Sequence, residues 1–184
     1  KLQVQSSLVG RINVYNILAA IGAAQALSLS NEIIEQGIRN LPAVAGRFER
    51  VSAGQPFLVI VDYAHTDDAL QNLIRTAREL NPKGRIITLF GCGGSRDRTK
   101  RPIMGELSGR LSDLTILTSD NPRQEDPLTI INDIVVGMQK SGGKYLIEAD
   151  REKAVALAIS EARAGDIVLL AGKGHETYQI FGDH

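Results

Sequence analysis

The sequence lacks the features of secreted, membrane-bound and nucleic-acid-binding proteins. A single cysteine, Cys92, excludes an intramolecular disulfide and suits a reducing compartment. No Cys/His spacing resembles a zinc site. Lysine and arginine total 21, as do aspartate and glutamate, so the net charge of zero argues against a nucleic-acid or membrane-surface partner. No apolar run approaches the length of a membrane span, and the polar start has no signal-peptide core. We therefore expect a cytoplasmic protein.

Familiar catalytic motifs are also missing. There is no Walker A loop, no Gly-x-Gly-x-x-Gly motif and no Ser/His/Asp set that would indicate a hydrolase. Cys92 has basic neighbours that favour a thiolate, but a packed cysteine in a glycine-rich turn is the stronger interpretation. The chemistry of this chain must therefore be sought in other clusters.

Residues 1–45 differ in pattern from the rest of the chain. Helices are predicted at Val14–Leu29 and Glu32–Asn40, with Asn31 as the cap of the second and Pro42 beyond its end. No strand alternation accompanies them, and the chain does not begin with Met. We expect a fragment of a longer protein, with 1–45 as the helical end of a preceding domain.

From residue 46 to 184 strands alternate with helices, which predicts an α/β fold with a Rossmann-like, mostly parallel sheet flanked by helices. Most of the strands are continuous apolar runs, as expected for strands buried on both faces. The predicted strands are Phe57–Val61, Arg85–Phe90, Leu114–Thr118, Lys144–Ile147 and Asp166–Ala171. The predicted helices are Asp67–Leu80, Arg101–Leu111, Pro127–Lys140 and Arg151–Ala162. Thr66 is the expected cap of the first, and Pro127 suits the first position of the third.

Three polar clusters each follow an apolar strand: residues 62–65, 120–123 and 172–176. The carboxyl ends of strands in an open α/β sheet form the ligand crevice. Asp62 and His65 suit a nucleotide or a metal, although negative charge at a helix start explains them equally well. The third cluster, which contains Glu176, is equally typical of a glycine-rich connection between a strand and a loop. Together at one edge, the three clusters predict a binding site.

Two segments indicate which ligands such a site takes. The glycine-rich, basic loop at 91–101 suits an anion, or else is a flexible turn with a solvated basic face. Its section from Gly93 to Lys100 is our candidate for disorder. In residues 120–123, Arg123 suits a carboxylate and Asp120 an ammonium, which together fit an amino acid. From spacing alone, however, an Asx turn is the stronger interpretation of this segment.

Taken in chain order, these motifs resemble one family, the Mur ligases of peptidoglycan synthesis, over essentially the whole chain. They are LVGRINVYN at 8–16, GRFE at 46–49, DYAH at 62–65, GCGGSRD at 91–97, KRP at 100–102, DNPR at 120–123 and GKGHE at 172–176. The resemblance implies the end of a central ATPase domain followed by a C-terminal domain that binds an amino acid. It also implies a bacterial enzyme that uses ATP and Mg²⁺ to activate UDP-N-acetylmuramoyl-dipeptide.

The resemblance further implies roles for particular residues. The Asp-Asn-Pro-Arg form is similar to that of members adding meso-diaminopimelate, whose second carboxylate an arginine would pair. The residues implied for that substrate are Arg96, Asp120, Asn121, Pro122, Arg123, Gly172 and Glu176, and those implied near ATP are Asn16, Arg47, Asp62 and His65. No catalytic or metal-binding residue is expected within this part of the chain, and Lys173 and His175 receive no role.

Asp67 stands where the family has proline, and both residues suit the first turn of a helix. Because the Walker A loop is missing, the isolated chain is predicted not to catalyse ligation, and a monomer is expected. The alternatives are a lysine-adding, cyanophycin or folylpolyglutamate ligase, or a stand-alone module that binds a small zwitterion.

Overall fold

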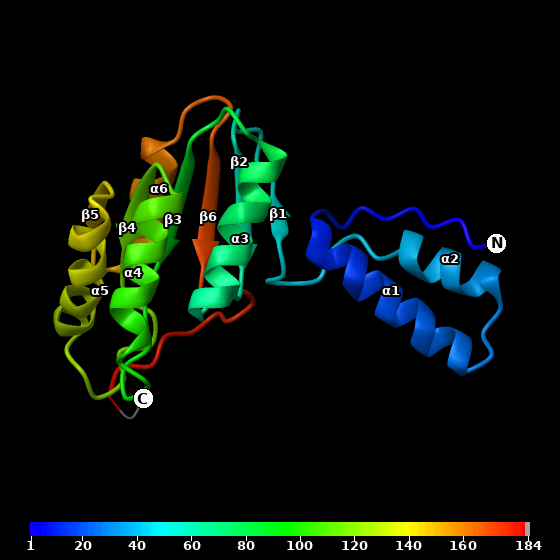
Figure 1. Ribbon diagram of the computed structural model, residues 1–184, viewed down its shortest axis with the longest axis horizontal. Coiled ribbons are helices and arrows are strands. Elements are labelled where there is room, and N and C mark those ends of the chain that lie inside the picture. The colour runs from blue at the N-terminus through cyan, green and yellow to red at the C-terminus, as the bar shows by residue number, and fades with distance from the viewer. Residues whose placement is uncertain (183–184) are drawn as a thin grey trace.

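A six-stranded sheet lies at the centre of the computed structural model, which describes residues 1–182 (Figure 1). Its strands lie in the order β1-β2-β6-β3-β4-β5, and all neighbours are parallel except β1 and β2. The strands are β1 (Glu49–Val51), β2 (Leu58–Asp62), β3 (Ile86–Phe90), β4 (Leu114–Leu117), β5 (Tyr145–Ile147) and β6 (Ile167–Ala171). The predicted mostly parallel sheet is therefore confirmed.

Helices cover both faces of the sheet. On one face α3 (Asp67–Leu80), α4 (Lys100–Leu111) and α5 (Pro127–Ser141) bury Leu70, Met104 and Ile134 with the larger core cluster. On the other, α6 (Arg151–Glu161) buries Ala154 and Ala158 against alternate strand residues. Side chains alternate between the faces of a strand, so the continuous apolar runs supply both cores.

Helix starts follow the expected capping chemistry in two of three places. The Thr66 hydroxyl accepts a hydrogen bond from the backbone N–H of Ala69 at the start of α3. Asp126 caps α5, with proline at the first helical position. The cap assigned to Asn31 was wrong: Ser30 accepts from the N–H of Ile33, and Asn31 is already helical. Ser30 is the N-cap because its backbone is extended, which is the conformation that an N-cap residue adopts.

The strand β1 was not predicted. It has three residues, two of them charged, and pairs antiparallel with β2 at the edge of the sheet. Its residues are exposed or half-buried, so no apolar run marks it in the sequence. Short, charged edge strands resist pairing with other chains, which accounts for its composition.

The first two helices, α1 (Arg11–Ala26) and α2 (Asn31–Arg39), lie to one side of the sheet (Figure 1). The first begins three residues earlier than predicted, after Gly10, whose φ of 94° lets the chain turn into the helix. Val9 packs against the larger core cluster and ties this segment to the rest. Within the described residues, no helix is long and apolar enough to cross a membrane. The boundary at residue 45 stays a prediction.

Candidate ligand-binding site

A cavity of about 350 Å³ opens where β2, β3, β4 and β6 end. The structure brings Arg96, Asp120, Asn121, Arg123, Gly172, Glu176 and His65 together as predicted, and adds Tyr63, Gly91, Gly93, Asp97 and Lys100 to the lining. Parallel strands end at the same edge, so clusters far apart in the sequence meet there.

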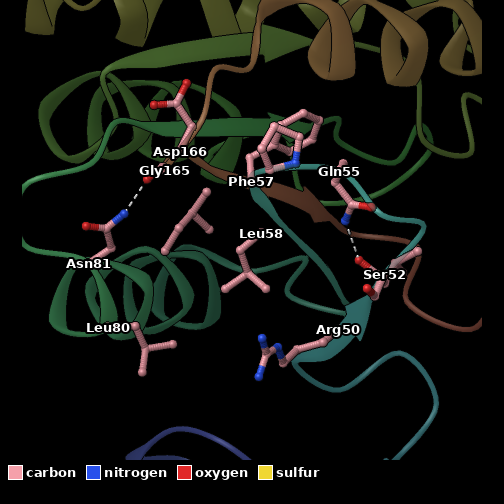
Figure 2. A pocket seen from close by; sticks show the side chains of 12 residues that line it. Arg50, Ser52, Gln55, Phe57, Leu58, Leu80, Asn81, Gly165 and Asp166 are labelled. Carbon is pink, nitrogen blue, oxygen red and sulfur yellow. Dashed lines mark hydrogen bonds between the residues drawn. The ribbon is translucent and has the colours of Figure 1, made fainter.

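A second cavity, of about 530 Å³, lies at the opposite edge of the sheet (Figure 2). It is larger, but no predicted site residue lines it. Two of its polar side chains are used internally: Asn81 donates to the carbonyl of Gly165, and Asp166 pairs with Arg85. We therefore place the candidate site at the carboxyl edge, where several polar side chains face the cavity.

Cations form one wall of the candidate site. Arg123 donates through Nη1 to the carbonyl oxygens of Gly94, at 3.0 Å, and Asn121, at 3.4 Å. Its φ of 52° is uncommon for a residue with a side chain, and this backbone turns the arginine back over the glycine loop. Lys100 lies beside it, with Nζ 3.0 Å from the carbonyl oxygen of His65, and Arg96 is exposed at the rim.

Carboxylates also line the candidate site. Asp120 is 9% exposed, and its Oδ1 accepts a 2.7 Å hydrogen bond from the backbone N–H of Asn121. Within residues 1–182 its Oδ2 is buried and has no hydrogen-bond partner; we call this atom the open oxygen. A Cβ on Gly172 would lie 3.0 Å from it, so the glycine leaves the space beside this oxygen clear. A buried carboxylate oxygen needs a donor, and a ligand ammonium is one.

Glu176 and Asn121 are held from behind by Lys173. The Nζ atom of Lys173 donates to Asn121 Oδ1 at 2.8 Å and to Glu176 Oε2 at 2.7 Å. The other oxygen of Glu176 accepts a 3.3 Å hydrogen bond from the Tyr63 hydroxyl. Sequence reasoning left Lys173 without a role, although a lysine between two glycines directly after a buried strand is a feature that could have identified it.

Arg101 is a structural residue that sequence reasoning missed. It is fully buried, and its guanidinium donates to both oxygens of Glu125 at 2.8 Å and to Asp133 at 2.9 Å. Nη2 also donates to the carbonyl oxygen of Gly93. The solvated basic face considered for this loop is therefore wrong at Arg101, which joins the glycine loop to α5.

Hydrogen bonds also hold part of the segment Gly93–Lys100, for which we expected disorder. The loop is hydrogen-bonded from Gly94 N–H to the carbonyl of Asn121 and from Ser95 N–H to Glu125. The side-chain hydrogen bonds from Arg101, followed by the Ser95 N–H, lower the pKa of Glu125 to about 2. Glu125 therefore stays ionised and keeps the loop attached near the Arg123 backbone.

Pro122 does not line the cavity, but its carbonyl accepts from the N–H of Glu125 and closes the turn. A Cβ on Gly94 would lie 1.8 Å from the same carbonyl oxygen, so the loop can pack there only with glycine. The Asx-turn interpretation of this segment and the ligand interpretation are compatible, because the turn presents Asp120 and Arg123 to the cavity.

The residues implied near ATP are only partly gathered. His65 lines the cavity, and Arg47 lies over the Tyr63 ring, 5.4 Å from its centroid. Both oxygens of Asp62 accept from backbone N–H groups, those of Phe48 and Ala64, so Asp62 holds its own loop. Burial is the largest effect on Asp62 and raises its pKa. Asn16 is exposed on α1, apart from the cavity, and donates to Asn13.

Comparisons with known proteins agree with this fold. The family model described as "Mur ligase, glutamate ligase domain" matches residues 46–174. A protein of Solibacter usitatus (strain Ellin6076) named UDP-N-acetylmuramoyl-L-alanyl-D-glutamate--2,6-diaminopimelate ligase is 59% identical over 183 residues, which is 100% of this chain and 37% of that protein.

Solved structures are similar as well. One of a UDP-N-acetylmuramoyl-L-alanyl-D-glutamate--2,6-diaminopimelate ligase matches with a TM-score of 0.74 and 39% identity, covering 98% of this chain and 37% of the other. Escherichia coli FolC in complex with ADP shares the fold, with a TM-score of 0.70 and 23% identity, over 94% of this chain and 38% of its own.

The fold and site define an α/β domain with cations and carboxylates around one cavity at the carboxyl edge of its sheet. The chain belongs to the Mur ligase family. It spans about 37% of the length of the curated relatives that it matches.

Proposed function

We propose that this chain is the amino-acid-binding part of a longer bacterial ligase, an ATP-dependent amide-forming enzyme. That enzyme would join meso-diaminopimelate to UDP-N-acetylmuramoyl-L-alanyl-D-glutamate through an acyl phosphate, in the cytoplasm and as a monomer. The names of the relatives support this substrate pair.

The observation that carries the proposal is the pairing of charges across the cavity. The open oxygen of Asp120 lacks a hydrogen-bond donor within residues 1–182, which a ligand ammonium would supply, and Arg123, Arg96 and Lys100 supply cations for carboxylates. Charge-assisted hydrogen bonds of this kind are about twice as strong as neutral ones. A zwitterion with charges at both ends fits this arrangement.

The same geometry favours meso-diaminopimelate over L-lysine. Both carry two ammonium groups, but only the first has a carboxylate at its far end. Lysine would leave one cation of the wall without its partner, and an unmet charged group costs roughly 1–3 kcal/mol or more.

ATP would bind beside this cavity, near Arg47 and His65, with Asp62 shaping their loop and Asn16 contributing from α1. The ADP bound to the structurally similar FolC supports a nucleotide in this fold. When bound, Mg²⁺ would neutralise phosphate charge. Among residues 1–182 no three His, Cys, Asp or Glu side chains are placed to hold a metal ion, so the residues present do not fit Mg²⁺.

We further propose that residues 1–45 close the central ATP-binding domain and that residues 46–184 form the C-terminal domain. Exposed apolar side chains on α1 and α2, among them Ile12, Leu18 and Ile33, support a missing neighbour for this segment. The isolated chain, supplied with ATP, Mg²⁺ and all substrates, should show no turnover. Measurable amide formation would overturn this part.

The test uses steady-state ligation by the full-length enzyme, with meso-diaminopimelate and L-lysine compared. The wild type should prefer meso-diaminopimelate. Arg123→Ala should lower kcat/KM for it by about ten- to a hundredfold, because a charged hydrogen bond is lost. Arg98→Ala is the matched control: Arg98 lies in the neighbouring glycine-rich loop but does not line the cavity, pairs with Asp133, and has a side chain that is 60% exposed. Equal use of both amino acids by the wild type would refute the proposal.

A further inference from the structure

Lys173 is a buried cation that touches the site from behind. Its side chain is 8% exposed, and its Nζ pairs with Glu176 at 2.7 Å and lies 5.1 Å from the centroid of the Tyr178 ring. Burying an ammonium is costly unless it is paired, so its place here needs a reason. It does not line the cavity, and the proposed ligand residues do not include it.

The pairing changes what Glu176 offers to a ligand. One carboxylate oxygen is occupied by Lys173 and by the amide of Asn121, and the other accepts from Tyr63. Burial is the largest effect on Glu176, but hydrogen bonding and attraction from Lys173 hold its pKa below the ordinary value. Glu176 therefore stays ionised, while its negative charge is balanced from within the protein.

Asp120 is different. Arg151, whose charge interacts with that of Asp120, gives its hydrogen bonds to the carbonyl oxygens of Ser119 and Ala171 and not to a carboxylate. The open oxygen of Asp120 thus remains for a ligand. Of these two carboxylates that line the cavity, Glu176 is paired with a cation and Asp120 is not.

We infer that Lys173 is a specificity-determining residue: through its buried charge it disfavours an amino acid of net positive charge relative to one of net zero charge. At neutral pH L-lysine carries one net positive charge, and meso-diaminopimelate carries none. Three cations and three carboxylates line the cavity, and Lys173 adds a fourth cation behind them. The inference rests on the proposed function, because it concerns the choice between these two amino acids.

The experiment measures kcat/KM of the full-length enzyme for both amino acids in four forms: wild type, Lys173→Met, Glu176→Gln and the double variant. Assays at about pH 8.5 keep Glu176 ionised when its lysine is removed. Lys173→Met should lower the preference for meso-diaminopimelate on the order of tenfold, since a unit charge acts across a partly buried site. The double variant, which loses both charges, should return toward the wild-type preference.

Glu176→Gln supplies a test of opposite sign and does not depend on folding of Lys173→Met. It leaves Lys173 unbalanced, so the preference for meso-diaminopimelate over L-lysine should rise, and a fall would count against the inference. A merely structural role for Lys173 would lower kcat/KM for both amino acids equally, with no change in their ratio. An unchanged ratio, in an enzyme whose wild type prefers meso-diaminopimelate, would overturn the inference about Lys173 and leave the proposed function standing. A wild type with no such preference would refute the proposed function and the inference with it.

Discussion

Replacing Arg101 by methionine should destabilise this chain more than any exposed arginine of the same loop. Methionine keeps much of the length and removes the guanidinium that joins Gly93, Glu125 and Asp133. The side chain of Arg101 is fully buried. Removing one partner of a buried ion pair costs about 3–5 kcal/mol, because the remaining charges lose their compensation.

The expected value lies near the lower end of that range, about 3 kcal/mol. Glu125 and Asp133 are 23% and 31% exposed, so both can recover hydration when the arginine is gone. Arg98→Met is the matched control, since Arg98 pairs with the same Asp133 but is 60% exposed. An exposed pair contributes about 0–1 kcal/mol.

Urea unfolding of the chain at several pH values measures both effects. The pKa of Glu125 is lowered from 4.5 to about 2 in the folded protein, so its contribution is complete above pH 4.5 and is lost as the pH falls toward 2. Arg101→Met should reduce this loss of stability in acid. The reasoning fails if Arg101→Met costs no more than Arg98→Met, or if its acid dependence equals that of the wild type.

Three further outcomes are expected. Gly172→Ala should reduce use of meso-diaminopimelate in ligation assays, because φ is 102° and the added Cβ lies 3.0 Å from the open oxygen of Asp120; an unchanged KM would contradict this. Asp120→Asn should keep or raise the melting temperature while lowering kcat/KM at least about tenfold, since it removes an uncompensated buried charge, and a large loss of stability would argue against it. Cys92, whose pKa burial raises to about 12, should react with iodoacetamide at neutral pH only after unfolding; rapid labelling of the folded chain would show the packing to be wrong.

Much of the fold was predictable because local patterns agree with tertiary packing. The apolar run that became β3 is buried at all five positions, and its burial on both faces requires helices on both sides. Thr66 caps α3 through a contact three residues away, which is a property of neighbouring residues alone. The edge strand β1 escaped prediction because its pairing with β2 creates it, and no apolar pattern does.

The candidate site was likewise predictable from the sequence only in part. The residue types and their positions after strands were sufficient to gather seven predicted residues around one cavity. Arg101 and Lys173 were not recognisable as buried, because basic residues beside glycines are usually solvated. Their burial depends on polar partners distant in the sequence: Asn121 lies 52 residues from Lys173, and Asp133 on another helix pairs with Arg101.

By itself, the sequence determined the alternation of strands and helices, the parallel sheet and the edge at which its polar clusters meet, since each follows from local periodicity and chain order. Only the tertiary structure decided the charge balance of the site: Lys173 balances Glu176, whereas the open oxygen of Asp120 has no hydrogen-bond partner within residues 1–182. The physical reason is that the cost and the sign of a buried charge depend on which groups surround it in space, and spacing along the chain does not specify those groups.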